Sequence, residues 1–282
     1  MLKLMYITNQ PEIAQIADNN GVDRIFVDLE MIGKKERQAG MDTVQSNHCV
    51  ADILRVKKAV KHAEILARVN PIHEETKEYS SSQKEIDEVI QAGADIVMLP
   101  YFKTVEEVES FIKFVDGRAK ALPLLETPEA VECIDDILEL PGLDEIFVGL
   151  NDLSLGYKKK FMFELLTDGT LENLCLKFKQ KNLSFGFGGI ASLGKGKLPS
   201  EYIIREHYRL ESTAAILSRS FCRAEAIKDL NKIKAAFEIG IRDIRNFEKE
   251  CELHSNYFRK NEEEVVRRVK KIVDGMCVSG RK

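Results

Sequence analysis

Eight short apolar runs, separated by longer amphipathic stretches, constrain the fold of this chain most strongly. Most runs contain four or five consecutive apolar residues, as expected for strands buried on both faces. The stretches between them have apolar residues at spacings of three and four, which is typical of helices. This alternation indicates βα units around a parallel sheet. The runs are Leu2–Thr8, Arg24–Glu30, Glu64–Asn70, Ile96–Tyr101, Ala119–Glu126, Glu145–Leu150, Ser184–Gly188 and Ala214–Phe221.

Eight strands are the number that closes a (β/α)8 barrel, and a chain of 282 residues fits such a barrel of roughly 250 residues with an extension. We therefore predict an α/β fold, a (β/α)8 TIM barrel with extra C-terminal helices. An open doubly wound sheet shows the same periodicity and remains the alternative. The predicted helices are Pro11–Asn19, His48–Lys61, Gln83–Ala92, Val105–Val115, Pro128–Leu138, Leu171–Lys181 and Pro199–Leu210.

The last quarter of the chain differs in character, because long charged helices replace the βα units. We assign residues 1–222 to the barrel core and residues 223–282 to the last barrel helix and a C-terminal helical extension. This segment is either a cover for the barrel or an oligomer contact, and we predict a homo-oligomer. Its expected apolar stripe consists of Ile227, Leu230, Ile233, Phe237, Ile241, Ile244 and Phe247, followed by Val265, Val269 and Ile272.

Charge and composition exclude several classes of protein. Lysine and arginine number 42 against 46 acidic residues, a net charge of -4 that gives no reason to expect nucleic acid as a partner. Polar residues appear within the first eight positions, too early for a signal peptide, and no stretch approaches the roughly 20 apolar residues of a membrane span. The six cysteines are scattered, without a C-x-x-C pair. We expect a cytoplasmic protein with no membrane partner.

Polar residues that directly follow the apolar runs are the candidate site residues, because the active site of such a barrel lies at the carboxyl ends of its strands. Glu126 and Asp152 each follow a hydrophobic run. Two carboxylates without a nearby histidine or cysteine suit Mg²⁺ or Mn²⁺. Capping of the following helices explains them equally well. The full set of candidates is Asp28, Glu30, Arg68, Asn70, Glu126, Asn151, Asp152, Ser218 and Arg219.

Four ordered motifs carry a resemblance to a known family. They are Arg68-Val69-Asn70-Pro71, Leu99-Pro100 with Glu106-Glu107-Val108, Leu124-Leu125-Glu126-Thr127, and Gly149-x-Asn151-Asp152-Leu153-Ser154. This set resembles the metal-dependent 2-oxo-acid aldolases of the hydroxy-oxo-heptanedioate type and the citrate lyase β subunits, in the phosphoenolpyruvate/pyruvate barrel superfamily. The match is good over residues 20 to 155 and loose elsewhere.

The resemblance implies a metal-dependent carbon–carbon lyase that acts on a small oxo acid. It implies that Glu126 and Asp152 ligate Mg²⁺ or Mn²⁺, and that Arg68 lies beside the oxo and carboxylate oxygens of the substrate. A divalent cation and a guanidinium stabilise the enolate that forms when the bond next to an oxo acid breaks.

The residues after the second run depart from the family pattern. The family aldolases resemble one another in having an acid/base histidine there, but this chain has Met31 after Asp28-Leu29-Glu30. The general base is therefore unassigned. We take Asp28 and Glu30, with Arg68, as candidate catalytic residues. His48 and His73 are possible proton carriers, although a cap or loop role explains each of them more simply.

The segment after the seventh run is rich in glycine, and barrels often hold phosphate on backbone N–H groups at this place. Gly188, Ser218 and Arg219, together with Asn151 and Arg68, are our candidate substrate-binding residues. The simpler interpretation is that the glycines only let the chain turn tightly.

The leading functional hypothesis is a lyase that makes or breaks a bond next to a pyruvate- or acetyl-type enolate, with an aldolase ahead of a thioester lyase. A phosphoenolpyruvate-dependent transfer enzyme is the second hypothesis. A non-catalytic protein that binds metal and oxo acid is the third, and Met31 is the residue that motivates it.

Overall fold

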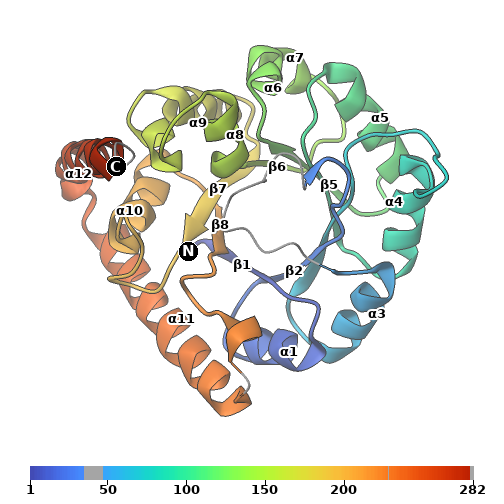
Figure 1. Cartoon of the computed structure of the whole chain (residues 1–282), viewed down its shortest axis with the longest axis horizontal. Coiled ribbons are helices and arrows are strands. Elements are labelled where there is room, and N and C mark those ends of the chain that lie inside the picture. The colour runs from blue at the N-terminus through green and yellow to red at the C-terminus, as the bar shows by residue number, and fades with distance from the viewer. Residues whose placement is uncertain (35–46, 228, 280–282) are drawn as a thin grey trace. The chain divides into compact units, whose positions relative to one another are not determined.

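A computed structural model of the chain describes residues 1–34, 47–227 and 229–279 (Figure 1). Eight strands in this part of the chain form a closed parallel barrel in sequence order, so the predicted (β/α)8 fold is confirmed and the open sheet is wrong. The strands are β1 (Lys3–Ile7), β2 (Arg24–Asp28), β3 (Glu64–Arg68), β4 (Ile96–Leu99), β5 (Lys120–Leu125), β6 (Glu145–Val148), β7 (Ser184–Ile190) and β8 (Ala214–Leu217).

The register of β2 and β3 places charged residues at both ends of the same strand pair. Arg24 is opposite Glu64 where the two strands begin, and Asp28 is opposite Arg68 where they end. All five residues of β2 are buried, as the continuous apolar run predicted. The carboxyl end of this pair therefore carries two of the candidate site residues side by side.

Helices alternate with the strands, and capping side chains fix where several of them begin. Thr104 accepts a hydrogen bond from the backbone N–H of Glu107, and Thr127 accepts one from that of Ala130. Gly93, directly after α4, has a φ of +106°, which favours glycine at this turn. The helices of the first half are α1 (Pro11–Asn19), α3 (Val50–Ala59), α4 (Ser82–Gln91), α5 (Val105–Val115), α6 (Pro128–Glu132) and α7 (Ile134–Ile137).

The second half contains helices that differ in part from the prediction. The helices are α8 (Leu150–Gly156), α9 (Thr170–Gln180), α10 (Ser200–Leu210), α11 (Leu230–Leu253) and α12 (Phe258–Ser279), with 3₁₀ helices η1 (Met162–Leu166), η2 (Ala224–Ala226) and η3 (Ser255–Tyr257). The prediction missed α8, because the buried Leu150 extends the apolar run of β6 without a break. The single predicted helix at residues 128–138 is wrong, since α6 and α7 are separate helices whose apolar spacing is continuous.

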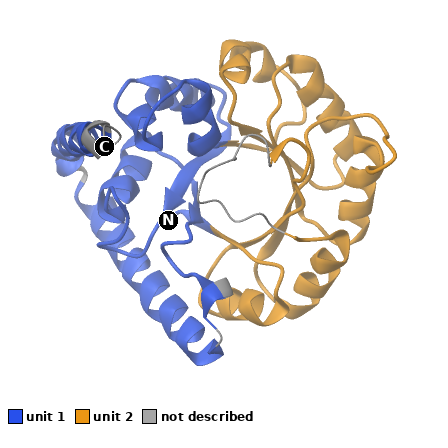
Figure 2. Ribbon diagram, in the orientation of Figure 1, with its two compact units in different colours: residues 1–4, 148–282 blue, residues 5–147 orange. Residues whose placement is uncertain are grey.

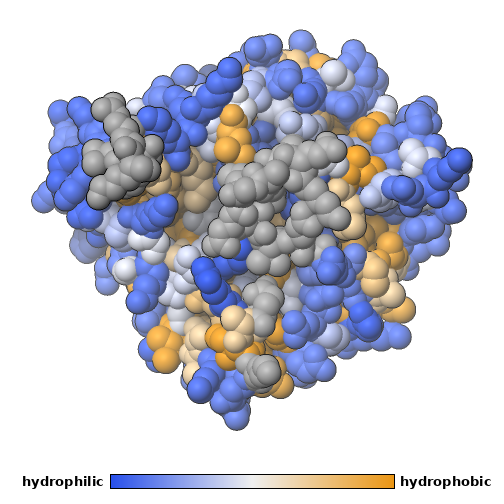
Figure 3. Space-filling model, viewed as in Figure 1, coloured by the Kyte–Doolittle hydropathy of each residue, from blue (hydrophilic) through white to orange (hydrophobic). Residues whose placement is uncertain are grey.

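The chain separates into two compact units (Figure 2). Unit 2 is residues 5–147 and unit 1 is residues 1–4 with 148–282. Fully buried Phe26 and Phe111 belong to the core of unit 2, and Phe178, Phe187 and Phe237 belong to that of unit 1. The helices of unit 2 present a mostly hydrophilic surface with small hydrophobic groups (Figure 3). Our proposed division at residue 222 remains a prediction.

The C-terminal helices of unit 1 bury much of the stripe that the sequence predicted. Ile233, Phe237, Ile241 and Ile244 are buried on α11, whereas Leu230 is 47% exposed at its first position. Val265 and Val269 of α12 are also buried. The homo-oligomer remains a prediction. No helix in the described ranges is both long and apolar enough to cross a membrane.

Candidate active site

Arg68 and Asp28 form a two-point ion pair at the carboxyl ends of β3 and β2. Arg68 Nε lies 2.8 Å from Asp28 Oδ1, and Nη2 lies 2.9 Å from Oδ2. The guanidinium also lies over the ring of Phe26, 5.4 Å from its centroid. Asp28 is 3% exposed, while the side chain of Arg68 is 15% exposed. This arrangement fixes the plane of the guanidinium.

Nη1 of Arg68 is the part of the guanidinium that remains for a ligand. The contacts of this side chain with Asp28 and Glu30 use Nε and Nη2, and among the described residues Nη1 makes no hydrogen bond. A guanidinium that two carboxylates orient and that keeps a donor free is suited to hold an anionic oxygen.

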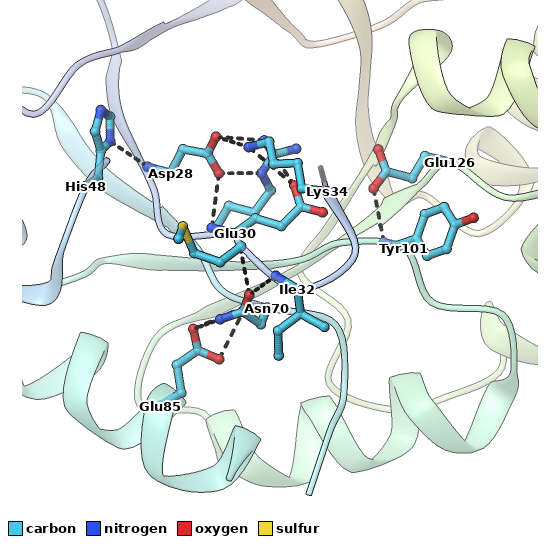
Figure 4. Close-up of polar contacts among 11 residues, drawn as sticks. Asp28, Glu30, Ile32, Lys34, His48, Asn70, Glu85, Tyr101 and Glu126 are labelled. Carbon is cyan, nitrogen blue, oxygen red and sulfur yellow. Dashed lines mark hydrogen bonds and ion pairs between the residues drawn. The ribbon is translucent and has the colours of Figure 1, made fainter. Parts of the chain in front are cut away.

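Lys34 and Glu30 complete a cluster of four charged side chains, of which Arg68 is the one that is not fully buried. Lys34 Nζ lies 2.5 Å from Asp28 Oδ2 and 3.5 Å from Glu30 Oε2. Glu30 Oε2 in turn lies 3.3 Å from Arg68 Nη2. Figure 4 shows Asp28, at the end of β2, with Glu30 and Lys34 from the segment that follows, their side chains pointing toward one another. We call Asp28, Glu30, Lys34 and Arg68 the charge cluster.

The charges of this cluster stabilise the ionised forms of Asp28 and Arg68. Burial alone would raise the pKa of Asp28, but the Arg68 guanidinium and the Lys34 ammonium outweigh it and hold that pKa well below its usual range. Burial would likewise lower the pKa of Arg68, but Asp28 and Glu30 raise it above its ordinary value. Asp28 is therefore a permanent anion at neutral pH, which makes it a poor proton acceptor.

Glu126 lies at the end of β5 within electrostatic reach of Arg68, whose pKa it helps to raise. It is 4% exposed, and its Oε1 accepts a 3.0 Å hydrogen bond from the backbone N–H of Tyr101 (Figure 4). Tyr101 has a φ of +51°, an uncommon value for a non-glycine residue. The following helix is capped by Thr127, so Glu126 is not its N-cap, and the capping interpretation of this residue is wrong.

Asn70 holds the turn after β2 in position. Its Oδ1 accepts hydrogen bonds from the backbone N–H groups of Met31 and Ile32, at 2.8 and 2.9 Å. Its Nδ2 donates to Glu85 of α4 at 2.9 Å, and its backbone N–H also faces that carboxylate. Burial raises the pKa of Glu85, and the hydrogen bonds from Asn70 oppose this rise. The side chain at position 31 is 41% exposed, so Met31 contributes its backbone to this network.

The two candidate histidines have different surroundings. The Nδ1 of His48 accepts a 3.0 Å hydrogen bond from the backbone N–H of Asp28, so this imidazole lies directly beside the end of β2. Both ring nitrogens of His73 lie 2.8 Å from backbone carbonyl oxygens, those of Pro71 and Ser80. These contacts tie His73 to its own loop, and His48 is the better placed of the two for proton transfer.

The candidates of unit 1 lie on α8 and at the ends of β7 and β8. Asp152 is 9% exposed in the first turn of α8, where Asn151 Nδ2 donates to its Oδ1 at 3.1 Å. Gly188 has a φ of +46°, and a Cβ there would lie 2.8 Å from Leu150 Cδ1. Ser218 and Arg219 are half-buried in a turn that a 2.8 Å hydrogen bond from Phe221 N–H to Ser218 O closes. The positive φ and the close packing both favour glycine at this position, and the role of Gly188 in substrate binding remains a prediction.

The donor set suits Mg²⁺ or Mn²⁺ better than zinc. Among the described residues, no group of three or more His, Cys, Asp or Glu side chains is arranged to hold a metal ion. A cation held by one or two carboxylates must keep water or substrate oxygens, and Mg²⁺ binds in that way. The buried carboxylates of Glu126 and Asp152 fit that chemistry, each within its own unit.

The structure brings Asp28, Glu30 and Arg68 together and adds residues that the sequence did not single out. Lys34, Tyr101 and Glu85 are the additions. Lys34 was the easiest of them to predict from the sequence, because it follows Glu30 by four residues, the spacing of a local ion pair. Nothing in the local sequence marks Tyr101 or Glu85.

The closed barrel defines a (β/α)8 protein, and the charge cluster lies at the carboxyl ends of its strands, the face where barrels of this kind hold their sites. The chain belongs to the HpcH/HpaI aldolase/citrate lyase family, whose sequence profile matches residues 3–169, more than half of its length. This confirms the predicted family. No curated protein matches the chain in sequence.

Solved structures share the fold at low sequence identity. An HpcH/HpaI aldolase from Desulfitobacterium hafniense DCB-2 has a TM-score of 0.58 and 15% identity, covering 83% of this chain and 93% of its own. An HpcH/HpaI aldolase/citrate lyase family protein from Burkholderia cenocepacia J2315 has a TM-score of 0.59 and 12% identity, covering 83% and 94%. The citrate synthase SbnG has a TM-score of 0.58 and 16% identity, covering 82% and 92%.

Proposed function

We propose that this chain is a divalent-metal-dependent carbon–carbon lyase that forms or cleaves a bond next to a pyruvate- or acetyl-type enolate. Membership of the aldolase/citrate lyase family supports a lyase. The observation that carries the proposal is Arg68, which Asp28 and Glu30 orient through Nε and Nη2, while Nη1 makes no hydrogen bond with any described residue.

Arg68 performs two tasks in this reaction. In the cleavage direction a base removes the proton of the substrate hydroxyl, the carbon–carbon bond breaks, and its electron pair passes into the oxo-acid half as an enolate. The guanidinium binds the oxygens of that half and stabilises the charge as it develops. Asp28 and Glu30 act as positioning residues in this proposal, because their carboxylates hold Arg68. The enolate then takes a proton to give the free oxo acid.

We propose Glu126 as a ligand of a Mg²⁺ or Mn²⁺ ion, and the same role for Asp152 is proposed from the family resemblance alone. When bound, such an ion supplies Lewis-acid stabilisation of the enolate oxygen. Tyr101 supports this assignment for Glu126, because its backbone N–H orients the carboxylate from one side. The side-chain amide of Asn151 likewise donates to the Asp152 carboxylate and orients it.

A non-catalytic protein that binds metal and oxo acid is the second candidate. Position 31 carries a methionine where the family pattern has a histidine, and a thioether cannot carry a proton. His48, beside the backbone of Asp28, is the group we propose for that task. Turnover that disappears in a His48→Gln variant with unchanged ligand binding supports the lyase, whereas ligand binding without turnover of any oxo-acid substrate supports the binding protein.

Calorimetric titration of oxalate, an enolate mimic, into metal-stripped protein with and without Mg²⁺ or Mn²⁺ tests the proposal. Wild type is expected to bind oxalate more tightly with metal, and Glu126→Gln is expected to lose that gain. Glu129→Gln is the matched control, because Glu129 lies three residues away in an exposed pair with Lys103. Equal binding with and without metal, or an unaffected Glu126→Gln variant, would contradict the metal site. A coupled assay for pyruvate release from hydroxy-oxo acids then tests the lyase reaction.

A further inference from the structure

A tight turn after β2 carries two side chains of the charge cluster. A 3.4 Å hydrogen bond from the Lys34 N–H to the Met31 carbonyl oxygen closes this turn, and Glu30 directly precedes it. Lys34 Nζ lies 2.5 Å from Asp28 Oδ2, and Glu30 Oε2 lies 3.3 Å from Arg68 Nη2. The position of the turn therefore affects how both side chains meet their partners in the cluster.

Asn70 braces this turn against the end of β3. Its Oδ1 accepts hydrogen bonds from the backbone N–H groups of Met31 and Ile32, at 2.8 and 2.9 Å. Asn70 is 6% exposed and follows Arg68, the last residue of β3, by two residues. The end of β3 thus holds the segment after β2 at two places, with the guanidinium of Arg68 and with the amide of Asn70.

Glu85 of α4 fixes the orientation of the Asn70 amide. Its Oε1 accepts a 2.9 Å hydrogen bond from Asn70 Nδ2, and both of its oxygens lie 3.2 Å from the Asn70 backbone nitrogen. An ionised carboxylate only accepts hydrogen bonds, so the amide must turn Nδ2 toward Glu85 and Oδ1 toward the turn. Figure 4 shows Asn70 between Glu85 and Ile32.

The start of α4 is itself tied to the loop that follows β3. The His73 N–H donates to Ser82 Oγ at 2.9 Å, and the Ser82 N–H donates to the His73 carbonyl oxygen at 3.2 Å. Glu85 lies three residues further along the helix and is 8% exposed. Burying a carboxylate costs free energy that an apolar side chain at this place would avoid, so packing of α4 alone does not explain Glu85.

We propose that Glu85, acting through Asn70, is a positioning residue for the anion site at Arg68. The pair holds the turn at the place from which Glu30 and Lys34 reach the charge cluster, and neither Glu85 nor Asn70 needs to touch the ligand. That the anion is an oxo-acid carboxylate rests on the proposed function, whereas the brace rests on the contacts alone.

Two variants break the brace and one double variant inverts it. Asn70→Ser shortens the side chain, and Glu85→Leu removes the acceptor that orients the amide. In Asn70→Asp/Glu85→Gln the aspartate still accepts from the turn, the glutamine amide donates to the aspartate, and the glutamine oxygen faces the backbone nitrogen of position 70. The number of charges stays the same. Glu88→Leu is the matched control, because Glu88 is an exposed carboxylate of the same helix.

Calorimetry measures the affinities for sulfate and for oxalate with Mg²⁺, and urea unfolding measures stability. We expect Asn70→Ser and Glu85→Leu to bind both anions about 10-fold or more weakly, which corresponds to about 1.4 kcal/mol. The inverted double variant and Glu88→Leu should remain within about 3-fold of wild type, which is less than 1 kcal/mol. Asn70→Ser keeps the test decisive if Glu85→Leu does not fold.

A purely structural brace gives a different result. It lowers the stability of Asn70→Ser and Glu85→Leu, but the folded protein then binds anions as wild type does. That result would overturn the proposal, and so would an inverted double variant that folds but binds as weakly as the two single variants.

The outcome also separates this inference from the proposed function. If the brace variants bind sulfate weakly but metal does not enhance oxalate binding and no substrate turns over, the lyase proposal fails and the role of Glu85 stands. If metal-dependent oxalate binding and pyruvate release are found but the brace variants match wild type, the lyase proposal stands and the role of Glu85 fails.

Discussion

Arg68 Nε lies 2.8 Å from Asp28 Oδ1, and Arg68 Nη2 lies 2.9 Å from Asp28 Oδ2. The last residues of two adjacent strands therefore form a two-point ion pair. The register that places Asp28 opposite Arg68 creates this contact directly. Asp28 is therefore committed to a partner, and its role is to hold the guanidinium in one plane. The family resemblance alone does not distinguish this role from that of a proton acceptor.

Asp28→Asn is expected to weaken both stability and anion binding. Removing one partner of a buried ion pair costs about 3–5 kcal/mol, because the other charge remains buried. The affinity for oxalate should fall as well, since Arg68 loses the partner that fixes its plane. Urea unfolding at pH 7 and oxalate calorimetry measure the two effects. Wild-type affinity in a folded Asp28→Asn variant would show that the pair does not orient Arg68.

The pH dependence of the same pair has a defined sign. The folded-state pKa of Asp28 is lowered, so its contribution to stability is present above its ordinary pKa of about 4 and is lost as the pH falls through the folded-state value. The stability gap between wild type and Asp28→Asn should therefore be constant between pH 5 and 7 and shrink only in stronger acid. A gap that closes already near pH 5 would contradict this assignment.

Much of the fold could be predicted from periodicity. Strands of a parallel sheet are buried on both faces, and they therefore appear in the sequence as continuous apolar runs. The β-strands and the helix limits marked by Thr104, Thr127 and Gly93 were predictable for that reason. Periodicity fails where two elements share one apolar run. Leu150 is buried like the strand before it, and so the start of α8 is hidden in the sequence.

The site was predictable in its charged residues and not in their partners. Asp28, Glu30 and Arg68 were found because the carboxyl ends of strands are adjacent in a barrel. The contact between Asn70 and the backbone of Met31 and Ile32 depends on the path of a turn, which spacing does not encode. Likewise, Tyr101 reaches Glu126 through its backbone N–H, a group that every non-proline residue possesses.

Arg24 is expected to matter for stability and not for ligand binding. It is fully buried where β2 begins, with both terminal nitrogens on Glu145 and Nε 3.0 Å from Glu64 Oε2. Arg24→Met should lower the free energy of unfolding by about 3–5 kcal/mol, because the buried Glu145 carboxylate loses its two contacts with this guanidinium. Urea unfolding measures this loss, and oxalate calorimetry should give wild-type affinity.

The variant pair Arg24→Met and Glu145→Gln provides the control for this ion pair. The double variant should regain part of the stability that Arg24→Met loses, since no uncompensated carboxylate remains at position 145. Simple addition of the two single losses would mean that the two side chains do not interact energetically.

Gly188→Ala discriminates between the two interpretations of the glycine-rich strand end. A methyl group there would lie 2.8 Å from Leu150 Cδ1 at a φ of +46°, so the variant should lose about 1–3 kcal/mol of stability from crowding. Thermal unfolding of the single variants and of the double variant with Leu150→Ala measures how far the two positions are coupled. An equally stable Gly188→Ala variant with weaker oxalate binding would instead support the predicted role in substrate binding.

His207 is expected to make folding sensitive to mild acid. It is fully buried and stacks on Phe187 with ring centroids 3.8 Å apart, and its Nδ1 lies 2.9 Å from Ser212 Oγ. Burial lowers the pKa of His207 to about 3, so between its ordinary pKa of about 6.5 and that value only the unfolded chain binds the proton. Stability that is full above pH 6.5 is therefore lost progressively as the pH falls toward 3.

His207→Phe keeps a ring against Phe187 and removes the titrating group. Its free energy of unfolding should fall less between pH 7 and pH 4.5 than that of wild type, by about 2 kcal/mol. Urea unfolding at the two pH values measures the difference, and His62→Phe, which removes an exposed histidine, serves as the control. Because every other titrating group is common to wild type and variant, a parallel fall in the two proteins would show that His207 is protonated in the folded state at pH 4.5.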